Sequence, residues 1–173
     1  MIKWTYITNN DNTARYTLGK LGKRVLFFIG INPSTARPDD LDRTVTRVEN
    51  FALDNGFDGW VMLNVYAQRA TNPKDMDKTP NLQLHKENIE QIKNLIKKIP
   101  EYQICAGWGT EIERRKYLKD LLKDIIETIG HDKNWIHLNQ LTKYNHPRHP
   151  LYLPSNSEFS SFDTKAYLKT LFD

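Results

Sequence analysis

The segment Arg24–Thr35, with the sequence RVLFFIGINPST, decides the fold because it joins an apolar run to a small polar turn. The five apolar residues Val25–Ile29 are typical of a strand that is buried on both faces. The turn Gly30–Thr35 then combines one flexible residue, one rigid residue and three small polar side chains. Open α/β sheets bind ligands at the carboxyl ends of their strands, so this turn is the first candidate for a functional site.

The composition is that of an ordinary soluble globular chain. The 173 residues are 39% hydrophobic and 27% charged. No apolar run approaches the ~20 residues that a membrane-spanning helix needs, and Met1 opens a strand-like pattern instead of a signal peptide. We therefore expect a cytoplasmic protein with no membrane partner. It is expected to form a single domain over residues 1–173, with an N-terminal hairpin over 1–20 and a core over 21–173.

The formal net charge of +4 is mildly basic and favours the approach of a polyanionic partner. Most lysines fall on predicted helices, where a solvated face explains them. The cations in loops after predicted strands are more informative: Arg37, Arg69, Lys143 and Arg148. The single cysteine, Cys105, lies within a strand-like run, so we expect a small buried core residue and not a nucleophile.

Strand and helix patterns alternate along the chain after an N-terminal hairpin. Alternating segments over Lys3–Thr8 and Arg15–Leu18 flank the turn Asn9–Asn12 and predict that hairpin. Four strands are predicted after it, over Arg24–Ile29, Gly59–Val65, Tyr102–Ala106 and Asn134–Leu138. Apolar periodicity and capping residues predict helices over about Asp42–Asn55, Asn81–Lys98, Thr110–Ile129 and Asp163–Phe172.

Helical crossovers between successive strands make those strands parallel, with right-handed connections. The order of elements therefore predicts an α/β fold of three layers, α/β/α, around a central four-stranded, mostly parallel sheet that the hairpin precedes. In such a sheet the carboxyl ends of the strands share one edge. The polar and aromatic residues that we expect to meet there are Asn32, Asn64, Trp108, His146 and His149.

Three motifs resemble those of the uracil-DNA glycosylase superfamily, in the same order. Gly30–Pro33 matches four residues of the first motif of the mismatch-specific thymine and uracil DNA glycosylases, where Ser34 replaces a glycine. Met62–Val65 resembles the strand segment whose asparagine reads the Watson–Crick edge of an extruded base. His146–Leu151 resembles their His-Pro-Ser-Pro-Leu loop with one residue added. The whole pattern is also similar to a family of small uncharacterised bacterial and phage proteins.

The resemblance implies cleavage of a base–sugar bond, during which the sugar becomes oxocarbenium-like and the base anionic. It implies that Asn32 positions the attacking water, with its amide donating and accepting at once. It implies that Asn64 binds the edge of the base, although capping of the strand end is an alternative, structural role for this residue. His146 or His149 is expected to donate a hydrogen bond to the base as a neutral imidazole. The other turn residues of the expected substrate site are Gly30, Ile31, Pro33, Ser34 and Thr35.

Other residues have two interpretations each. Leu151 occupies the place of the residue that wedges into the duplex when a nucleotide is extruded, or it anchors the C-terminal segment. Tyr66 and Trp108 are candidates for stacking on a base, or they pack at the rim of the site. Arg148 is a candidate for phosphate binding. Asp42 caps the helix that it precedes or acts as a general base.

We expect an N-glycosidase that acts on a damaged or modified base in DNA, and no metal or cofactor. A chain without a Gly-rich dinucleotide fingerprint or a P-loop lysine is a poor candidate for hydride or phosphoryl transfer. Two alternatives stay open. One is a module that binds nucleic acid or a modified base without cutting it, since Ser34 and the altered histidine loop depart from the glycosylase motifs. The other is a hydrolase for a free nucleoside or nucleotide, which the modest charge allows.

Overall fold

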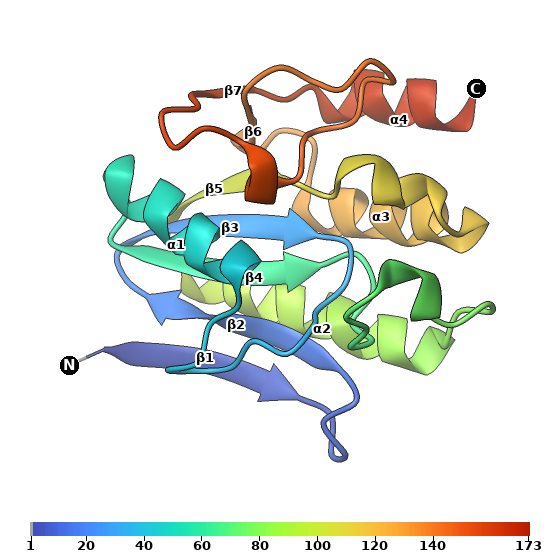
Figure 1. Ribbon diagram of the computed structural model, residues 1–173, viewed down its shortest axis with the longest axis horizontal. Helices are drawn as coiled ribbons and strands as arrows, with labels where there is room; N and C mark the ends of the chain where they lie inside the picture. The colour runs from blue at the N-terminus through green and yellow to red at the C-terminus, as the bar shows by residue number, and fades with distance from the viewer. Residues whose placement is uncertain (1) are drawn as a thin grey trace.

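The strands form one mixed sheet in the order β1-β2-β4-β3-β5-β6-β7 in the computed structural model, which describes residues 2–173 (Figure 1). The four central strands, β4, β3, β5 and β6, are parallel to one another, as the helical crossovers predict. The strands are β1 Lys3–Thr8, β2 Arg15–Leu21, β3 Arg24–Gly30, β4 Gly59–Asn64, β5 Glu101–Ala106, β6 Trp135–Leu138 and β7 Phe159–Ser161.

The prediction of a four-stranded sheet was wrong, because the sheet has seven strands. The predicted hairpin forms, but β2 pairs antiparallel with β4 and so extends the sheet instead of preceding it. That pairing joins Leu18 to Met62, residues far apart in the sequence, and no local pattern reports it. On the opposite edge β7 pairs antiparallel with β6. β7 has three residues, too few for an alternating pattern to be recognised.

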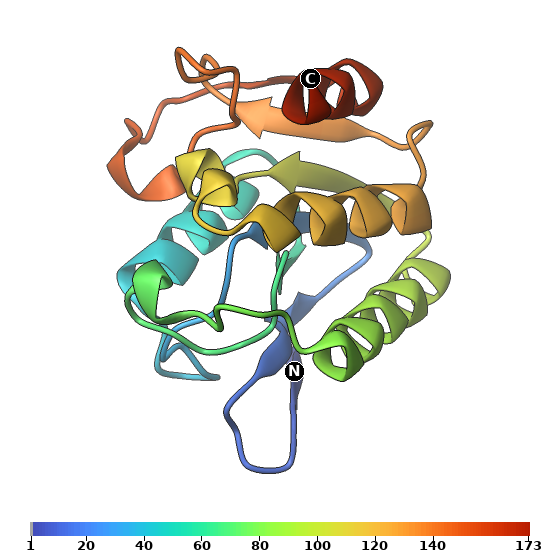
Figure 2. The ribbon, with the colours of Figure 1, turned by 90° about the vertical axis from the view of Figure 1, so that its right-hand side faces the viewer.

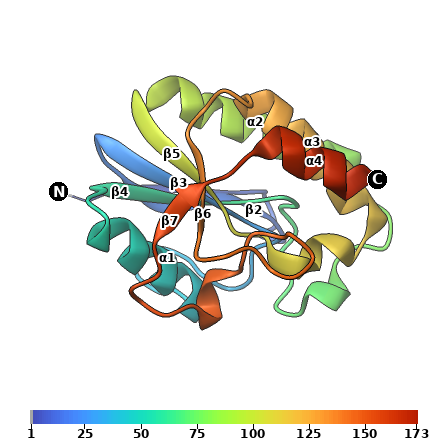
Figure 3. The ribbon, with the colours of Figure 1, turned by 90° about the horizontal axis from the view of Figure 1, so that it is seen from above.

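Helices cover both faces of the sheet, which gives the three layers expected (Figure 3). α1 covers one face, while α2, α3 and α4 cover the other, where α2 and α3 are neighbours (Figure 2). Among residues 2–173, none of the helices combines the length and the apolar character needed to span a membrane. The α-helices are α1 Arg43–Asp54, α2 Leu82–Lys98, α3 Lys116–Ile129 and α4 Thr164–Phe172, and the short 3₁₀ helices are η1 Pro73–Asp75, η2 Gly109–Glu113 and η3 Pro150–Tyr152.

Side-chain caps explain where three of the α-helices begin. The carboxylate of Asp42, the amide oxygen of Asn81 and the carboxylate of Asp163 each accept a backbone N–H three residues ahead. α3 is the exception, because it begins at Lys116 and not at Thr110. The residues before it, Gly109–Glu113, form η2, and the Glu113 carboxylate contacts Lys119 and His146.

The N-terminal hairpin supplies part of the core. Leu18 is fully buried and packs with the residues that face α1, whereas Ile7 of β1 is 36% exposed. Cys105 is also fully buried, as predicted, and burial raises the pKa of its thiol.

We predict that Leu18→Ala lowers the free energy of unfolding by about 2–5 kcal/mol, because it leaves a cavity in the core. The matched variant Ile7→Ala on the same hairpin is expected to change it by about 0.5 kcal/mol or less. Urea denaturation followed by circular dichroism measures both values. Equal, small effects of the two substitutions would show that the hairpin is not part of the cooperative core.

Candidate functional site

The turn after β3 and the loop after β4 remain hydrogen-bonded to each other beyond the ends of the strands. Val65 N donates to Gly30 O at 2.9 Å, and Ala70 N donates to Pro33 O at 2.8 Å. The parallel pairing of the two strands therefore continues into the segments that follow them. This backbone pairing holds the first predicted motif in place at the carboxyl edge of the sheet.

Asn32 is oriented by three backbone carbonyls. Its Nδ2 donates to the oxygens of Pro33 at 3.1 Å, Gln68 at 3.3 Å and Ala70 at 2.9 Å. The opposite orientation of the amide would set its oxygen against the same three oxygens, so Oδ1 points away from them. The amide hydrogens are used within the loop, and the expectation that Asn32 donates and accepts at once is corrected: it offers an acceptor alone.

A pocket of about 160 Å³ opens at this edge of the sheet, and we call it the edge pocket. Its volume lies below the ~300 Å³ at which drug-sized ligand sites begin, so it suits one small ring and not a dinucleotide. The predicted site residues on its wall are Gly30, Ile31, Asn32, Pro33, Ser34, Trp108 and His149. The other residues on the wall include Arg15, Asp42, Met62 and Glu111.

The loop that carries His149 is held at the edge pocket by the turn after β5. Gly109 has a φ of 62°, a conformation that favours glycine, and its N–H donates to Pro147 O at 2.9 Å. Leu151 N donates to Nδ1 of His149 at 3.2 Å, which places the proton of the neutral ring on Nε2. The side chain of His149 is exposed at the mouth of the pocket, but partial desolvation of its ring lowers its pKa, while Asp42 and Glu111 oppose that shift. The neutral ring thus offers an N–H donor.

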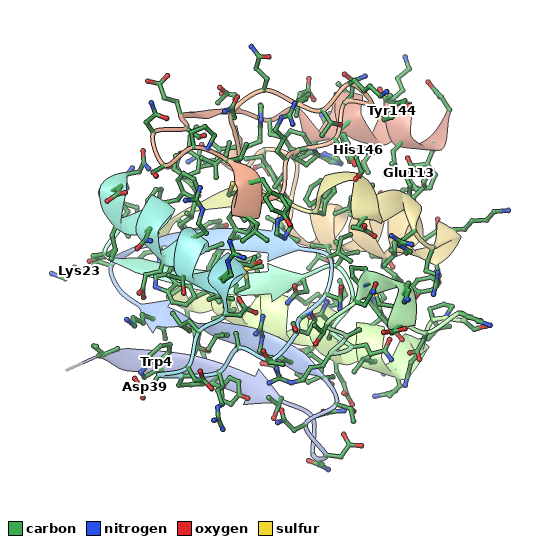
Figure 4. The ribbon with its side chains drawn as sticks, in the orientation of Figure 1. Trp4, Lys23, Asp39, Glu113, Tyr144 and His146 are labelled. Carbon is green, nitrogen blue, oxygen red and sulfur yellow. The ribbon has the colours of Figure 1, made fainter. Side chains whose placement is uncertain are left out.

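His146, the other histidine proposed for catalysis, lies outside the wall of the edge pocket. Trp108 Nε1 donates to the hydroxyl of Tyr167 at 2.8 Å, and this hydroxyl in turn donates to Nδ1 of His146 at 2.8 Å. Nε2 of His146 lies 3.2 Å from the Glu113 carboxylate (Figure 4). Burial lowers the pKa of His146, and Glu113 opposes that shift. Both ring nitrogens are engaged, so His146 ties α4 to η2.

Two predicted aromatic contacts are buried. Tyr66 lies fully buried among the residues that face α2 and α3, where its hydroxyl donates to Asp77 at 2.6 Å and accepts from Asn81 N at 2.8 Å. Trp108 borders the edge pocket but is also fully buried, and its ring packs against Phe162. Stacking of a base on either ring would require the core to open.

The remaining predicted contacts lie outside the edge pocket. Thr35 lines a neighbouring groove of about 430 Å³ that also contains Arg37 and Arg69, which we call the arginine groove. Arg148 is exposed and donates from Nε to Gln140 O at 2.7 Å. Leu151 is half-buried in η3.

Asn64 lies directly behind the wall of the edge pocket. A β-carbon added to Gly30 would lie 3.4 Å from Oδ1 of Asn64 and 2.9 Å from Cε of Met62. Asn64 is 1% exposed, and within residues 2–173 neither polar atom of its side chain has a hydrogen-bond partner. An unpaired buried amide costs free energy in the unliganded protein, so this residue is a candidate for contact with a ligand.

Arg15 is the main site residue that the sequence analysis missed. It is 1% exposed, and its Nη1 donates to Ala36 O at 3.1 Å. Burial and the nearby Arg69 lower the pKa of Arg15 to about 10, and Asp42 opposes that shift. An arginine at the start of a strand is ordinary in a sequence, and no pattern indicates that this one is buried. The sequence analysis named Asp42 as a helix cap or a general base. In the structure Asp42 caps α1 and also lies on the pocket wall.

The fold and the pocket define an α/β protein with a polar site at the carboxyl edge of its parallel strands. The chain belongs to the family described as protein of unknown function DUF1643, whose model matches residues 15–151. That range includes every residue on the wall of the edge pocket. Neither a curated protein nor a solved structure matches the chain significantly.

We predict that Asn64→Leu raises the free energy of unfolding by about 1–2 kcal/mol, because it replaces an unpaired buried amide with an apolar group of similar size. Thr17→Val is the matched control. Thr17 is also fully buried, but its hydroxyl lies within hydrogen-bond distance, 3.1 Å, of the Thr5 hydroxyl. Thr17→Val is therefore expected to lower the free energy of unfolding by about 1 kcal/mol. Thermal and urea denaturation measure both. Destabilisation by Asn64→Leu as large as that by Thr17→Val would contradict the unpaired state of Asn64.

Proposed function

We propose that the protein is an N-glycosidase that hydrolyses the bond between a damaged or modified nucleobase and its sugar in the edge pocket. The observation that carries the proposal is the arrangement of two asparagines at the ends of β3 and β4. Within residues 2–173, Oδ1 of Asn32 accepts no hydrogen bond, and the buried amide of Asn64 has no partner. The resemblance of both segments to the uracil-DNA glycosylase motifs supports the same reaction.

In this reaction Asn32 Oδ1 accepts a hydrogen bond from the attacking water and holds it below the sugar. The water oxygen forms a bond to C1′ of the sugar, and the C1′–N bond breaks with its electron pair moving to the base. The proton lost by the water ends on the base, so the products are the neutral base and a sugar with a hydroxyl group at C1′, which is an abasic site when the substrate is DNA. The Asp42 carboxylate on the same wall complements the positive charge that develops on the sugar.

The base is held by Asn64 and His149. The Asn64 amide carries a donor and an acceptor, so it pairs with a base edge that presents both. Met62 lies beside Gly30 on the pocket wall, and displacement of its flexible side chain gives the base access to Asn64. His149 donates from Nε2 to the base in its neutral form, which the lowered pKa of its ring maintains near pH 7.

A free nucleotide is the second candidate substrate. The arginine groove adjoins the edge pocket, because Ser34, Ala70 and Thr71 line both. A base in the edge pocket would leave its sugar and phosphate beside this groove. That arrangement suits a single nucleotide as well as a nucleotide that has been extruded from a strand.

The test is cleavage of oligonucleotides that carry uracil, a G·T mismatch, hypoxanthine or an enlarged pyrimidine, followed by alkali treatment at abasic sites. Free nucleosides and nucleotides with the same bases are assayed in parallel for base release. Asn32→Ala is expected to reduce the rate about 100-fold or more, since it removes the group that positions the water. The control Asn156→Ala, an exposed asparagine in the loop before β7, is expected to leave it unchanged.

Thermal melting shows whether Asn32→Ala keeps its fold after losing three contacts to carbonyls. Tight binding of an oligonucleotide without any cleavage would replace the proposed enzyme with a non-catalytic binding module. An unchanged rate in Asn32→Ala would remove Asn32 from the mechanism.

A further inference from the structure

Arg15 is a buried cation on the wall of the edge pocket. It begins β2 and is held there by its backbone, because Arg15 N donates to Ala67 O at 3.0 Å. The residue is 1% exposed, yet it lines the same pocket as Asn32 and His149. β2 thereby brings a positive charge to a site whose predicted residues come from β3 and from the loops that follow β3, β5 and β6.

Most of the hydrogen-bonding capacity of Arg15 is unused. A guanidinium has five N–H donors, and within residues 2–173 only Nη1 has a protein acceptor, the Ala36 carbonyl. Nε is buried with no partner. Arg69 beside it differs, since its three nitrogens donate to the backbone of the turn, to Tyr6 and to Asn12. Arg69 therefore stabilises the turn, whereas Arg15 keeps N–H donors that have no protein acceptor within residues 2–173.

No carboxylate of residues 2–173 lies within ion-pair distance of Arg15. Asp42 acts on it from farther away, and Glu111 on the same wall is paired with Arg114 at 2.8 Å. A guanidinium stays charged near pH 7, so it cannot avoid the cost of burial by losing a proton. An unpaired buried charge is expensive, and an anion that enters the pocket relieves that cost.

We propose that Arg15 is the anion-binding residue of the edge pocket and stabilises the nucleobase as it leaves with the electrons of the broken bond. This inference rests on the proposed function, because it places the base in the same pocket. The N–H groups of Arg15 donate to acceptor atoms of the base in the bound substrate. When the C1′–N bond breaks, negative charge grows on those atoms, so the interaction is stronger in the transition state than in the ground state.

Arg15 and His149 then have different roles. His149 donates one hydrogen bond as a neutral ring, and Arg15 supplies the positive charge. A base that is more acidic leaves more easily and depends less on that charge. The loss of Arg15 is therefore expected to slow a poor leaving group more than a good one, which a purely structural role for Arg15 would not do.

The kinetic test compares single-turnover cleavage rates on two substrates that differ only in the base, which is uracil or the more acidic 5-fluorouracil. Arg15→Met keeps the length of the side chain without its charge, and it is expected to lower the rate on uracil about 100-fold and that on 5-fluorouracil by less. Arg15→Lys restores part of the rate on uracil. Arg24→Met, which removes a half-exposed arginine paired with Glu101 at the other end of the sheet, is the matched control.

The binding test does not require cleavage. Free 5-fluorouracil is titrated into the protein by calorimetry at pH values on both sides of its own ionisation, which lies nearer neutrality than that of uracil. The wild-type protein is expected to bind the anion about tenfold more tightly than the neutral base, and Arg15→Met is expected to lose this preference. Thermal melting of Arg15→Met confirms that the variant is folded.

The two experiments separate the inference from the proposed function. If both the wild-type protein and Arg15→Met cleave, and the ratio of their rates on uracil and 5-fluorouracil is the same, the role of Arg15 is overturned. The N-glycosidase proposal then remains in place. No cleavage, together with a preference for the base anion that Arg15→Met abolishes, supports Arg15 as the anion-binding residue and rejects the N-glycosidase. Equal affinity of the wild-type protein for the anion and the neutral base overturns the inference.

Discussion

The site depends on the parallel pairing of β3 with β4 and on its continuation into the segments that follow both strands. The register sets Gly30 opposite Asn64, so the Asn64 side chain lies beside a residue that has none. Beyond the strands, the donors of Asn32 bind carbonyls on both segments and lock them together. A shift of the register by one residue would turn Asn64 to the other face of the sheet.

The polar groups near the carboxyl edge fall into two kinds. His146, Tyr66 and Trp108 have hydrogen-bond partners within the protein and hold its elements together. Arg15 and Asn64 are buried with polar atoms that have no partner among residues 2–173, and these atoms reduce the stability of the unliganded protein. Buried polar atoms without partners beside a pocket are candidates for contact with a ligand, so Arg15 and Asn64 mark the candidate site.

The sequence was sufficient to predict the four parallel strands, the caps at Asp42 and Asn81, and the edge at which Asn32 and His149 meet. These features follow from local periodicity and from the rule for helical crossovers. The sequence did not predict the burial of Arg15 or the separation of His146 from the pocket. Both result from tertiary contacts, with the turn after β3 and with α4, that no local pattern encodes.

The central claim is that the edge pocket receives a nucleobase between Asn64 and Arg15. The most direct measurement is a nuclear magnetic resonance titration of isotope-labelled protein with uracil, thymine or hypoxanthine, in which the Asn64 side-chain amide and the Arg15 Nε–H are followed. We expect one of these bases to shift both resonances together and saturably, while the amide of Asn55 at the end of α1 stays unchanged. If all three bases left both resonances unmoved, the account would be contradicted.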